Sequence, residues 1–300
     1  MKTYRLYQID SFTRERFHGN PAGVIPDAEG LTDDLMQRIA REMNDSETAF
    51  VFPPGSPDHD VHVRFFTPET EVPLCGHATI AAHYVLALEN GRCGRTIQKT
   101  GAGLLPVDTL RDGDDYAIVM TQGDPFVGEP LADDVVSAIT TALRITPSDL
   151  REDCPLTIAS AGHSKIMIGI RSVALLHSLR PDMASLAEIS RRVQCNGYYV
   201  FTLHPSDAVL VHGRMFAPAI GIAEDPVTGN ANGPLGAYLV HFGICRDLWQ
   251  GDRFDFKILQ GEAIRRDGGM TVHVSIKDGQ PGQVQITGHA VVAFRTEITI

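Results

Sequence analysis

The sequence has 300 residues, of which 43% are hydrophobic and 21% are charged, a balance typical of a folded globular protein with a core. The formal net charge of -11 opposes binding to nucleic-acid phosphates and to anionic membranes, so we expect neither partner. The 5 cysteines are widely spaced, the N-terminus does not read as a signal peptide, and no stretch reaches the roughly 20 apolar residues of a membrane helix. We therefore expect a soluble, cytoplasmic protein without a disulfide framework.

The first half of the chain contains more predicted strands than helices. A helix begins after Thr32, a suitable N-cap, because acids fill the first turn and Leu35 and Ile39 follow at helical spacing. A second helix, rich in small apolar residues, is predicted at 76–88. Alternation predicts strands at 4–12, 47–52, 61–66, near 98, 104–110 and 116–120, and the glycine and proline at 18–23 predict a turn cluster.

The second half repeats this order after a linker-like stretch at 123–125. Strands are predicted at 156–160, 166–170, 198–203, 209–216 and from 254 onward, and helices at 133–143, 183–193 and 229–242. Strands and helices do not alternate regularly, so the pattern favours an α+β fold over a doubly wound parallel sheet.

Landmarks in the two halves match at a nearly constant offset. Residues 64–68 (Arg-Phe-Phe-Thr-Pro) resemble residues 214–218 (Arg-Met-Phe-Ala-Pro), which lie 150 positions later. Further matched pairs are Gly76 with Gly229, Asn20 with His163, and Ile39 with Ile189. The offsets predict an internal duplication and therefore two related lobes.

Two predicted helix starts are led by glycine, at Gly76 and Gly229. The first amides of a helix lack partners within it and carry positive potential, so they stabilise an anion. For one such glycine, close packing of the helix against a sheet is the better explanation. For a matched pair beside His77 and Asn230, we favour sites that bind a carboxylate.

Five segments together resemble the phenazine-biosynthesis-like isomerases (PhzF-like), which share the fold of diaminopimelate epimerase. They span almost the whole chain in order, and their combination is specific although each segment alone is weak. The segments are FHGNPAG at 17–23, NDSETAFV at 44–51, FTP at 66–68, LCGHAT at 74–79 and EDPVTGNA at 224–231.

The resemblance implies an α+β fold of two pseudo-symmetric lobes. Each lobe would be a strongly curved sheet or barrel wrapped around a central helix, with the active site in the cleft between them. We expect residues 1–124 and about 288–300 to form the N-terminal lobe, and residues 125–287 to form the C-terminal lobe. The last strand would then return to the first lobe.

The resemblance also implies roles for individual side chains. Glu47 matches the family's general acid/base, and His77 and Asp225 match residues that hold the substrate and tune the proton transfer. From the residues alone, simpler interpretations stay open: Glu47 as a surface carboxylate, His77 as a helix-capping or packing residue, and Asp225 as a turn residue before Pro226.

Further substrate-binding candidates flank the two helix starts. Gly76 and Gly229 would offer backbone amides, and Asn230 stands where characterised family members often have serine, which leaves the substrate identity open. Asn20, in the first of the family-like segments, is an additional candidate.

Cys75 occupies the place of the first of the two cysteines of diaminopimelate epimerase. Residues 226–228 offer no thiol at the corresponding place in the second half, which disfavours a two-thiol racemase. Because a helix start lowers the pKa of a thiol, Cys75 is a candidate reactive group, with a packing role as the alternative.

We therefore expect an isomerase that moves a proton on a small carboxylate substrate without a cofactor, with Glu47 as general acid/base. The alternatives are an amino-acid-type epimerase or racemase that uses Cys75, a thiol or serine hydrolase, and a non-catalytic protein that binds small carboxylates. No histidine, cysteine and carboxylate spacing predicts a metal, and no G-x-G-x-x-G follows a strand to predict a flavin or nicotinamide. By analogy with the family, we expect a homodimer.

Overall fold

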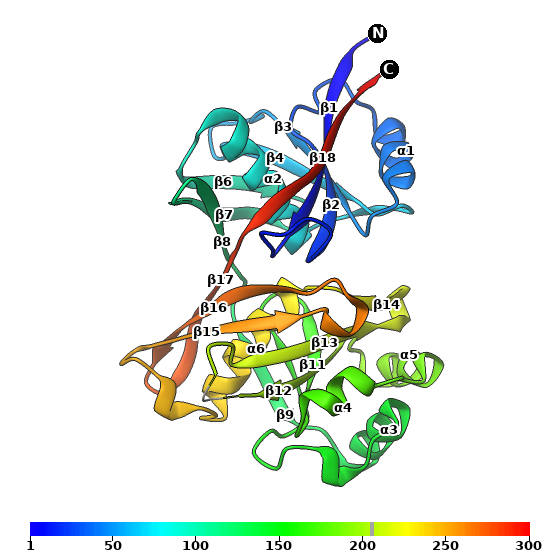
Figure 1. The fold of residues 1–300 in the computed structure, drawn as a ribbon, viewed down its shortest axis with the longest axis vertical. Coiled ribbons are helices and arrows are strands. Elements are labelled where there is room, and N and C mark those ends of the chain that lie inside the picture. The colour runs from blue at the N-terminus through cyan, green and yellow to red at the C-terminus, as the bar shows by residue number, and fades with distance from the viewer. Residues whose placement is uncertain (205–206) are drawn as a thin grey trace. The chain divides into compact units, whose positions relative to one another are not determined.

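The computed structural model describes residues 1–204 and 207–300, and these divide into two compact units. Unit 1 comprises Met1–Thr121 and Thr287–Ile300, and unit 2 comprises Gln122–Ile286. In each unit, strands surround one apolar helix, α2 (Gly76–Asn90) in unit 1 and α6 (Gly229–His241) in unit 2 (Figure 1). The many strands and few helices confirm the predicted α+β fold class.

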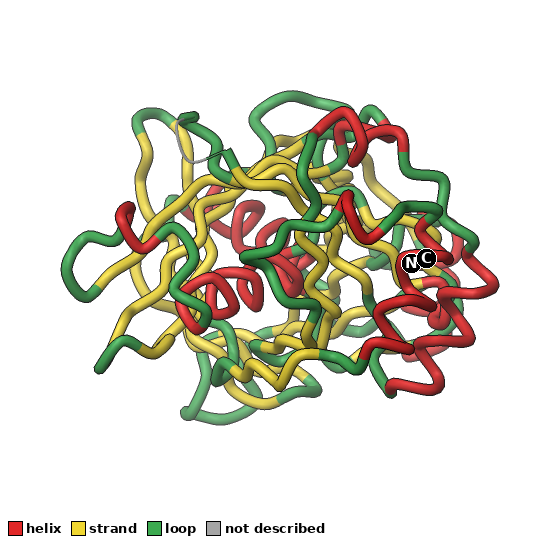
Figure 2. The backbone as a smooth tube through the Cα atoms, turned by 90° about the horizontal axis from the view of Figure 1, so that it is seen from below, coloured by secondary structure: helices red, strands yellow, loops and turns green. Residues whose placement is uncertain are grey.

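Unit 1 begins and ends with paired strands. β1 (Thr3–Ser11) runs antiparallel to β18 (Ala290–Thr299), so the two chain termini lie side by side (Figures 1 and 2). The other elements of unit 1 are β2 (Asn20–Ile25), α1 (Asp33–Met43), β3 (Thr48–Phe52), β4 (Val61–Phe66), β5 (Glu71–Val72), β6 (Gly94–Thr100), β7 (Gly103–Asp112) and β8 (Asp115–Thr121).

Unit 2 carries additional helices outside its strands. Its helices are α3 (Asp133–Leu143), α4 (Val173–Ser178), α5 (Met183–Val193) and α6. Its strands are β9 (Phe126–Pro130), β10 (Thr157–Ser160), β11 (Ser164–Gly169), β12 (Tyr198–Leu203), β13 (Val211–Ala217), β14 (Ile222–Asp225), β15 (Arg253–Gln260), β16 (Gly268–Lys277) and β17 (Gln280–Gly288), whose last residues leave the unit. Among the residues that the structure describes, every helix is too short or too polar to be a membrane span.

The strand pairing of unit 1 recurs in unit 2. In unit 1, β2 is parallel to β3, β3 is antiparallel to β4, and β4 is parallel to β6. In unit 2, β11, β12, β13 and β15 pair in the same order and with the same directions. Arg64 of β4 forms a bidentate ion pair with Glu71, as Arg214 of β13 does with Glu224. The predicted duplication is therefore confirmed.

The two central helices are apolar on all sides, which is the signature of a helix that must be enclosed. Figure 2 shows helical turns with strands around them. In α2, the small residues Ala78, Ala81 and Ala82 are fully buried and let the strands approach closely. In α6, Pro234 lacks an N–H, so the carbonyl of Asn230 loses its usual partner four residues on.

Several local predictions agree with the structure and one is wrong. Thr32 caps α1 by accepting a hydrogen bond from the Leu35 amide, and Asn44 ends that helix in the left-handed conformation. The predicted turn at 18–23 ends at Gly19, because Asn20 starts β2 and Pro21 lies opposite Asp10 of β1. Pro21 is tolerated because the pairing of β2 with β3 starts only at residue 23, so no second strand needs its missing N–H.

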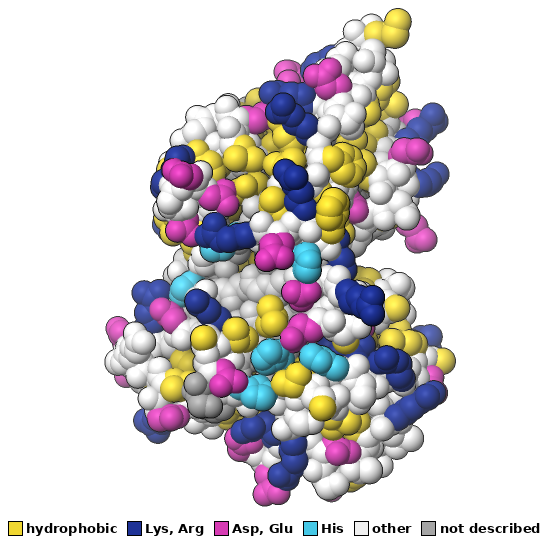
Figure 3. Space-filling view, in the orientation of Figure 1, with side chains coloured by type: hydrophobic (Ala, Val, Ile, Leu, Met, Phe, Trp, Pro, Cys, Tyr) yellow, Lys and Arg dark blue, Asp and Glu magenta, His cyan; other side chains and the backbone are white. Residues whose placement is uncertain are grey.

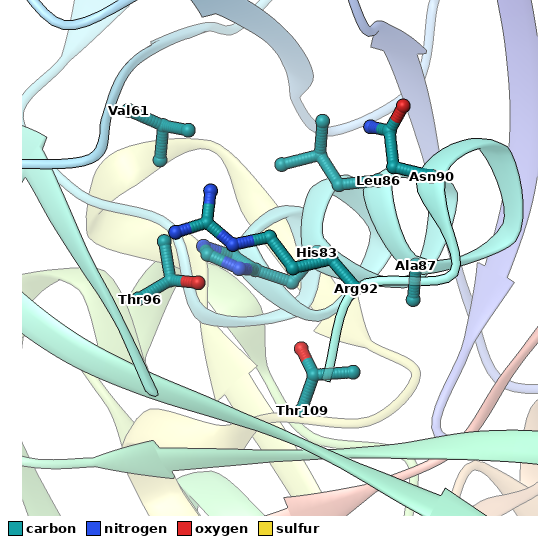
Figure 4. Close-up of a pocket in the computed structure, with 8 residues that line it drawn as sticks. All are labelled: Val61, His83, Leu86, Ala87, Asn90, Arg92, Thr96 and Thr109. Carbon is teal, nitrogen blue, oxygen red and sulfur yellow. The ribbon is translucent and has the colours of Figure 1, made fainter. Parts of the chain in front are cut away.

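His83 lies on α2 beside a cavity of about 120 Å³, which Figure 4 shows with its lining residues. Its Nε2 is 2.8 Å from Oε1 of Gln98 on β6. Burial lowers the pKa of His83 to about 4, below the 6.5 of a free histidine. His83 therefore contributes to packing and hydrogen bonding within unit 1 as a neutral imidazole.

His83 predicts a loss of stability in acid. Between pH 6.5 and 4 the unfolded chain binds a proton that the folded protein does not, so the free energy of unfolding falls as the pH is lowered. The shift corresponds to about 3 kcal/mol. We would measure the free energy of unfolding in urea across this pH range. In His83→Gln it should change by about 3 kcal/mol less than in the wild type. An unchanged dependence would contradict the burial of a neutral imidazole.

Candidate active site

Glu47 stands between the end of α1 and the start of β3. Asn44 terminates the helix with a left-handed conformation (φ 57°), and the chain then turns back so that Thr48 begins β3. Glu47 is thus the last residue before a buried strand, and its side chain is only 17% exposed. The carboxylate therefore lies beside the start of a buried strand and is partly exposed.

His77 bridges Glu47 and Cys75. Its Nε2 lies 3.4 Å from Oε2 of Glu47 and 3.2 Å from Oγ of Ser46. Its Nδ1 lies 3.4 Å from Sγ of Cys75. The side chains of His77 and Cys75 are almost completely buried. A carboxylate beside the start of β3 and an imidazole and a thiol at the start of α2 therefore form one connected cluster.

The start of α2 is fixed by hydrogen bonds to its backbone. Oγ1 of Thr79 donates to the carbonyl of Cys75 at 2.7 Å, and Oγ of Ser11 donates to the carbonyl of His77 at 2.8 Å. No side chain caps this helix at Cys75. Its first amides therefore stay available to an anion, and the carbonyls on either side cannot move easily.

This cluster can perform acid–base chemistry. A carboxylate can remove a proton from a substrate carbon, and the nearby imidazole and helix amides can stabilise the negative charge that develops. The ligand atoms of Glu47, Cys75 and His77 also lie within 4.8 Å of one another, so these residues could hold a metal ion, a set that sequence spacing did not reveal. The imidazole, however, directs one ring nitrogen to Cys75 and the other to Glu47, as in a hydrogen-bonded cluster.

The start of α6 in unit 2 is built differently. Asp225 ends β14, and its carboxylate accepts a hydrogen bond from the hydroxyl of Thr228, the residue before α6. Gln260 of β15 donates to the carbonyl of Asp225 at 2.9 Å and accepts from the amide of Thr228 at 3.2 Å. The loop from Asp225 to Thr228 is thereby tied to the sheet.

A buried polar network supports this loop. Tyr199 donates to Oδ1 of Asn232 at 2.5 Å, and Nδ2 of Asn232 donates to Gln260 and to the carbonyl of Thr228, each at 3.0 Å. Tyr199, Asn232 and Gln260 are fully buried. Sequence reasoning missed all three; the only signal was an asparagine within an otherwise apolar helix.

The structure places the remaining predicted residues in the same two groups. Gly76 and Gly229 are the buried first residues of α2 and α6, and Asn230 is the half-buried second residue of α6. Asn20 is buried in β2 opposite Ser11, the residue that holds the His77 carbonyl. Unit 1 therefore brings together Glu47, Cys75, His77, Gly76 and Asn20, and unit 2 brings together Asp225, Gly229 and Asn230.

Unit 2 also carries a histidine cluster that the sequence did not predict. Oε2 of Glu262 lies 2.7 Å from Nδ1 of His212 and 3.3 Å from Nε2 of His177. Burial opposes ionisation of Glu262, but its contacts with His212 and His177 outweigh burial and lower its pKa. Figure 3 shows histidine side chains gathered on this unit.

The buried network at α6 yields a stability prediction. In Tyr199→Phe, Oδ1 of Asn232 loses its hydrogen bond while the side chain loses only its hydroxyl oxygen, which should lower the free energy of unfolding by about 1–3 kcal/mol. Tyr4→Phe is the control, because it removes only a 3.3 Å bond to the carbonyl of exposed Glu29. If urea unfolding shows the same decrease in the free energy of unfolding for both variants, the network does not stabilise the protein as proposed.

Comparisons with known sequences identify the family of the chain. A family model described as phenazine biosynthesis-like protein matches residues 9–296. The chain is 53% identical to an uncharacterized isomerase of Clostridium acetobutylicum, over 100% of this chain and 99% of that protein. It is 31% identical to the trans-2,3-dihydro-3-hydroxyanthranilate isomerase of Pseudomonas aeruginosa, over 95% of this chain and 96% of that protein.

Solved structures extend the same likeness. The phenazine biosynthesis protein of the PhzF family from Bacillus anthracis is 30% identical and superposes with a TM-score of 0.88 over 100% of both chains. A hydroxyproline epimerase from Agrobacterium vitis shares the fold alone, with 15% identity and a TM-score of 0.63 over 99% of this chain and 92% of that chain. The chain is an enzyme of the isomerase class, and it belongs to the phenazine biosynthesis-like protein family.

Proposed function

We propose that this isomerase moves a proton on a small carboxylate substrate without a cofactor, with Glu47 as the general acid/base. The observation that carries the proposal is the 3.4 Å contact between Oε2 of Glu47 and Nε2 of His77, directly at the start of α2. A partly exposed carboxylate meets a buried imidazole there, and helix amides lie beside both.

In the proposed reaction, Glu47 removes a proton from one carbon of a conjugated frame and returns it to another. One hydrogen changes place and one double bond shifts, so no oxidant or reductant is needed. His77 stabilises the intermediate anion by a hydrogen bond, and the first amides of α2 add positive potential. Ser46, 3.2 Å from Nε2 of His77, helps to orient the ring.

The substrate class we propose is a cyclic, partly unsaturated carboxylate. Support comes from the named substrate of the Pseudomonas aeruginosa relative, a dihydro-hydroxyanthranilate. Trans-2,3-dihydro-3-hydroxyanthranilate is therefore the first compound to test, followed by related ring carboxylates with other substituents. Asn230, which offers both a donor and an acceptor, is the residue we expect to distinguish among them.

Removing the carboxylate at Glu47 should abolish turnover. A general base typically accelerates a reaction by about 10²–10⁴-fold. The kcat of Glu47→Gln should therefore decrease by about 10²-fold or more while the fold is kept. Isomerisation followed by NMR measures the loss. Glu42→Gln, an exposed position on α1, is the matched control and should behave as wild type. Turnover by Glu47→Gln at the wild-type rate would refute the proposal.

An epimerase that uses Cys75 is the second candidate. The observation in its favour is the 3.4 Å separation of the Cys75 thiol from Nδ1 of His77, since an imidazole at that distance can take the thiol proton. In unit 2, however, the residue that occupies the place of Cys75 before the central helix is Thr228, whose hydroxyl donates to Asp225. A two-thiol mechanism would lack its second thiol there.

The role of Cys75 can be tested separately. In the proposed isomerase, Cys75→Ala removes a packing and orienting neighbour of His77, so kcat should fall less than about 10-fold, well short of the loss of a general base. Steady-state kinetics on the same substrate gives the comparison. A loss in Cys75→Ala as deep as that in Glu47→Gln would instead favour thiol chemistry.

A further inference from the structure

The side chains of Glu47, Cys75 and His77 are three kinds of ligand that zinc takes in proteins: a carboxylate, a thiolate and an imidazole. One ligand atom from each side chain lies within 4.8 Å of the other two. Among residues 1–204 and 207–300, this is the only group of three metal-binding side chains that meets the condition. The cluster to which we assign acid–base chemistry therefore also has the composition of a metal centre.

The distances within the cluster are close to those between the ligands of a tetrahedral zinc ion. Zinc bonds of about 2.0–2.2 Å to nitrogen and oxygen, and of about 2.3 Å to sulfur, place tetrahedral ligands roughly 3.3–3.6 Å apart. Nε2 of His77 is 3.4 Å from Oε2 of Glu47 and 4.0 Å from Sγ of Cys75, and Nδ1 is 3.4 Å from the same sulfur. Rotation of the Cys75 and His77 side chains is therefore the only movement that three ligands on one ion require.

The charges of the cluster suit a buried divalent cation. A zinc ion bound by one carboxylate and one thiolate is neutral overall, so its burial costs far less than that of an isolated charge. Cys75 and His77 are 6% and 7% exposed, and the side chain of Glu47 is 17% exposed, so an ion can reach the ligands from solvent on the side of Glu47. The thiolate favours zinc over Mg²⁺ and Ca²⁺, which prefer oxygen ligands.

The internal duplication shows that the fold does not require these three side chains. The strands β3 and β12 have matching partners and directions, and α2 and α6 are the matching central helices. The counterparts of the three ligands in unit 2 are Gly197, Thr228 and Asn230. The side chain of Lys165 lies over Gly197, where unit 1 has its carboxylate. Unit 2 thus builds the same helix start without a thiol, an imidazole or a carboxylate at these positions.

We infer that unit 1 binds Zn²⁺ through Glu47, Cys75 and His77, and that the bound ion inhibits the enzyme. Without metal, the imidazole contacts the other two side chains as in a hydrogen-bonded cluster. Binding releases the thiol proton, and any proton on the ligating ring nitrogen, to solvent, and it changes no oxidation state. Only the inhibition rests on the proposed function, because a carboxylate that shares its charge with zinc is a much weaker base.

Cobalt(II) is the probe for binding, because a bond between cobalt and a thiolate gives a charge-transfer band in the near ultraviolet. Titration of the metal-free full-length protein with Co²⁺ should give a band that saturates, that Zn²⁺ abolishes and that Mg²⁺ leaves unchanged. Cys75→Ala should lose the band, whereas Cys93→Ala, which removes an exposed cysteine, is the control and should keep it.

The carboxylate and the imidazole can be tested with the same band. Loss of a group that merely supports a ligand weakens metal sites by about 10–100-fold, so Glu47→Gln and His77→Gln should each weaken Co²⁺ binding by about 10-fold or more. Glu42→Gln, at an exposed position of α1, should bind as wild type. Absence of a saturable band in the wild type, or an undiminished band in Cys75→Ala, would overturn the metal site.

Inhibition is measured on the ring carboxylate that the wild type converts. Zn²⁺ should lower kcat over the same concentration range in which it displaces Co²⁺, and a chelator should restore the rate. An unchanged or increased rate at saturating Zn²⁺ would overturn the inhibition. Failure of the acid/base proposal would appear as turnover by metal-free Glu47→Gln, whereas failure of the metal site would appear in the cobalt titration, which needs no turnover.

Discussion

The enclosure of α2 and α6 by strands decides where chemistry can take place in this protein. A helix that is mostly apolar on every side gains its stability from burial, and the polar side chains inside it, such as His83 and Asn232, are paired with neighbouring strands. At the N-terminal ends, backbone amides lack partners and favour anions. His77 and Asn230 stand at these two ends, which makes the helix starts the natural locations for a polar substrate.

Duplication supplied two similar helix starts, and their side chains have since diverged. The framework is kept, as the ion pairs of Arg64 and Arg214 with the following strands show. The chemistry differs, because one unit places the carboxylate of Glu47 beside its helix and the other places the ammonium of Lys165 over Gly197.

Elements with strong local signals could be predicted from the sequence. The Thr32 cap and the apolar segment after Gly76 can each be recognised from a few neighbouring residues. The structure has α1 and α2 at these two places. The strand at Asn20 was mistaken for a turn because glycine and proline dominate its local signal, while its pairing with β1 depends on residues elsewhere.

Candidate site residues divide in the same way. Glu47 and His77 were put forward because the segments around them resemble those of a family, not because their spacing showed contact. The joining of Glu47 to His77, and the network from Tyr199 through Asn232, depend on distances between elements that no local pattern encodes.

The most direct test of the account is hydrogen exchange at carbon, a partial reaction that requires only proton removal. Wild type, Glu47→Gln and Cys75→Ala would be incubated with a ring carboxylate substrate in heavy water, and loss of the carbon-bound proton signal would be followed by NMR. The account predicts exchange in wild type and in Cys75→Ala, and none above background in Glu47→Gln. Exchange that persists in Glu47→Gln and disappears in Cys75→Ala would contradict it.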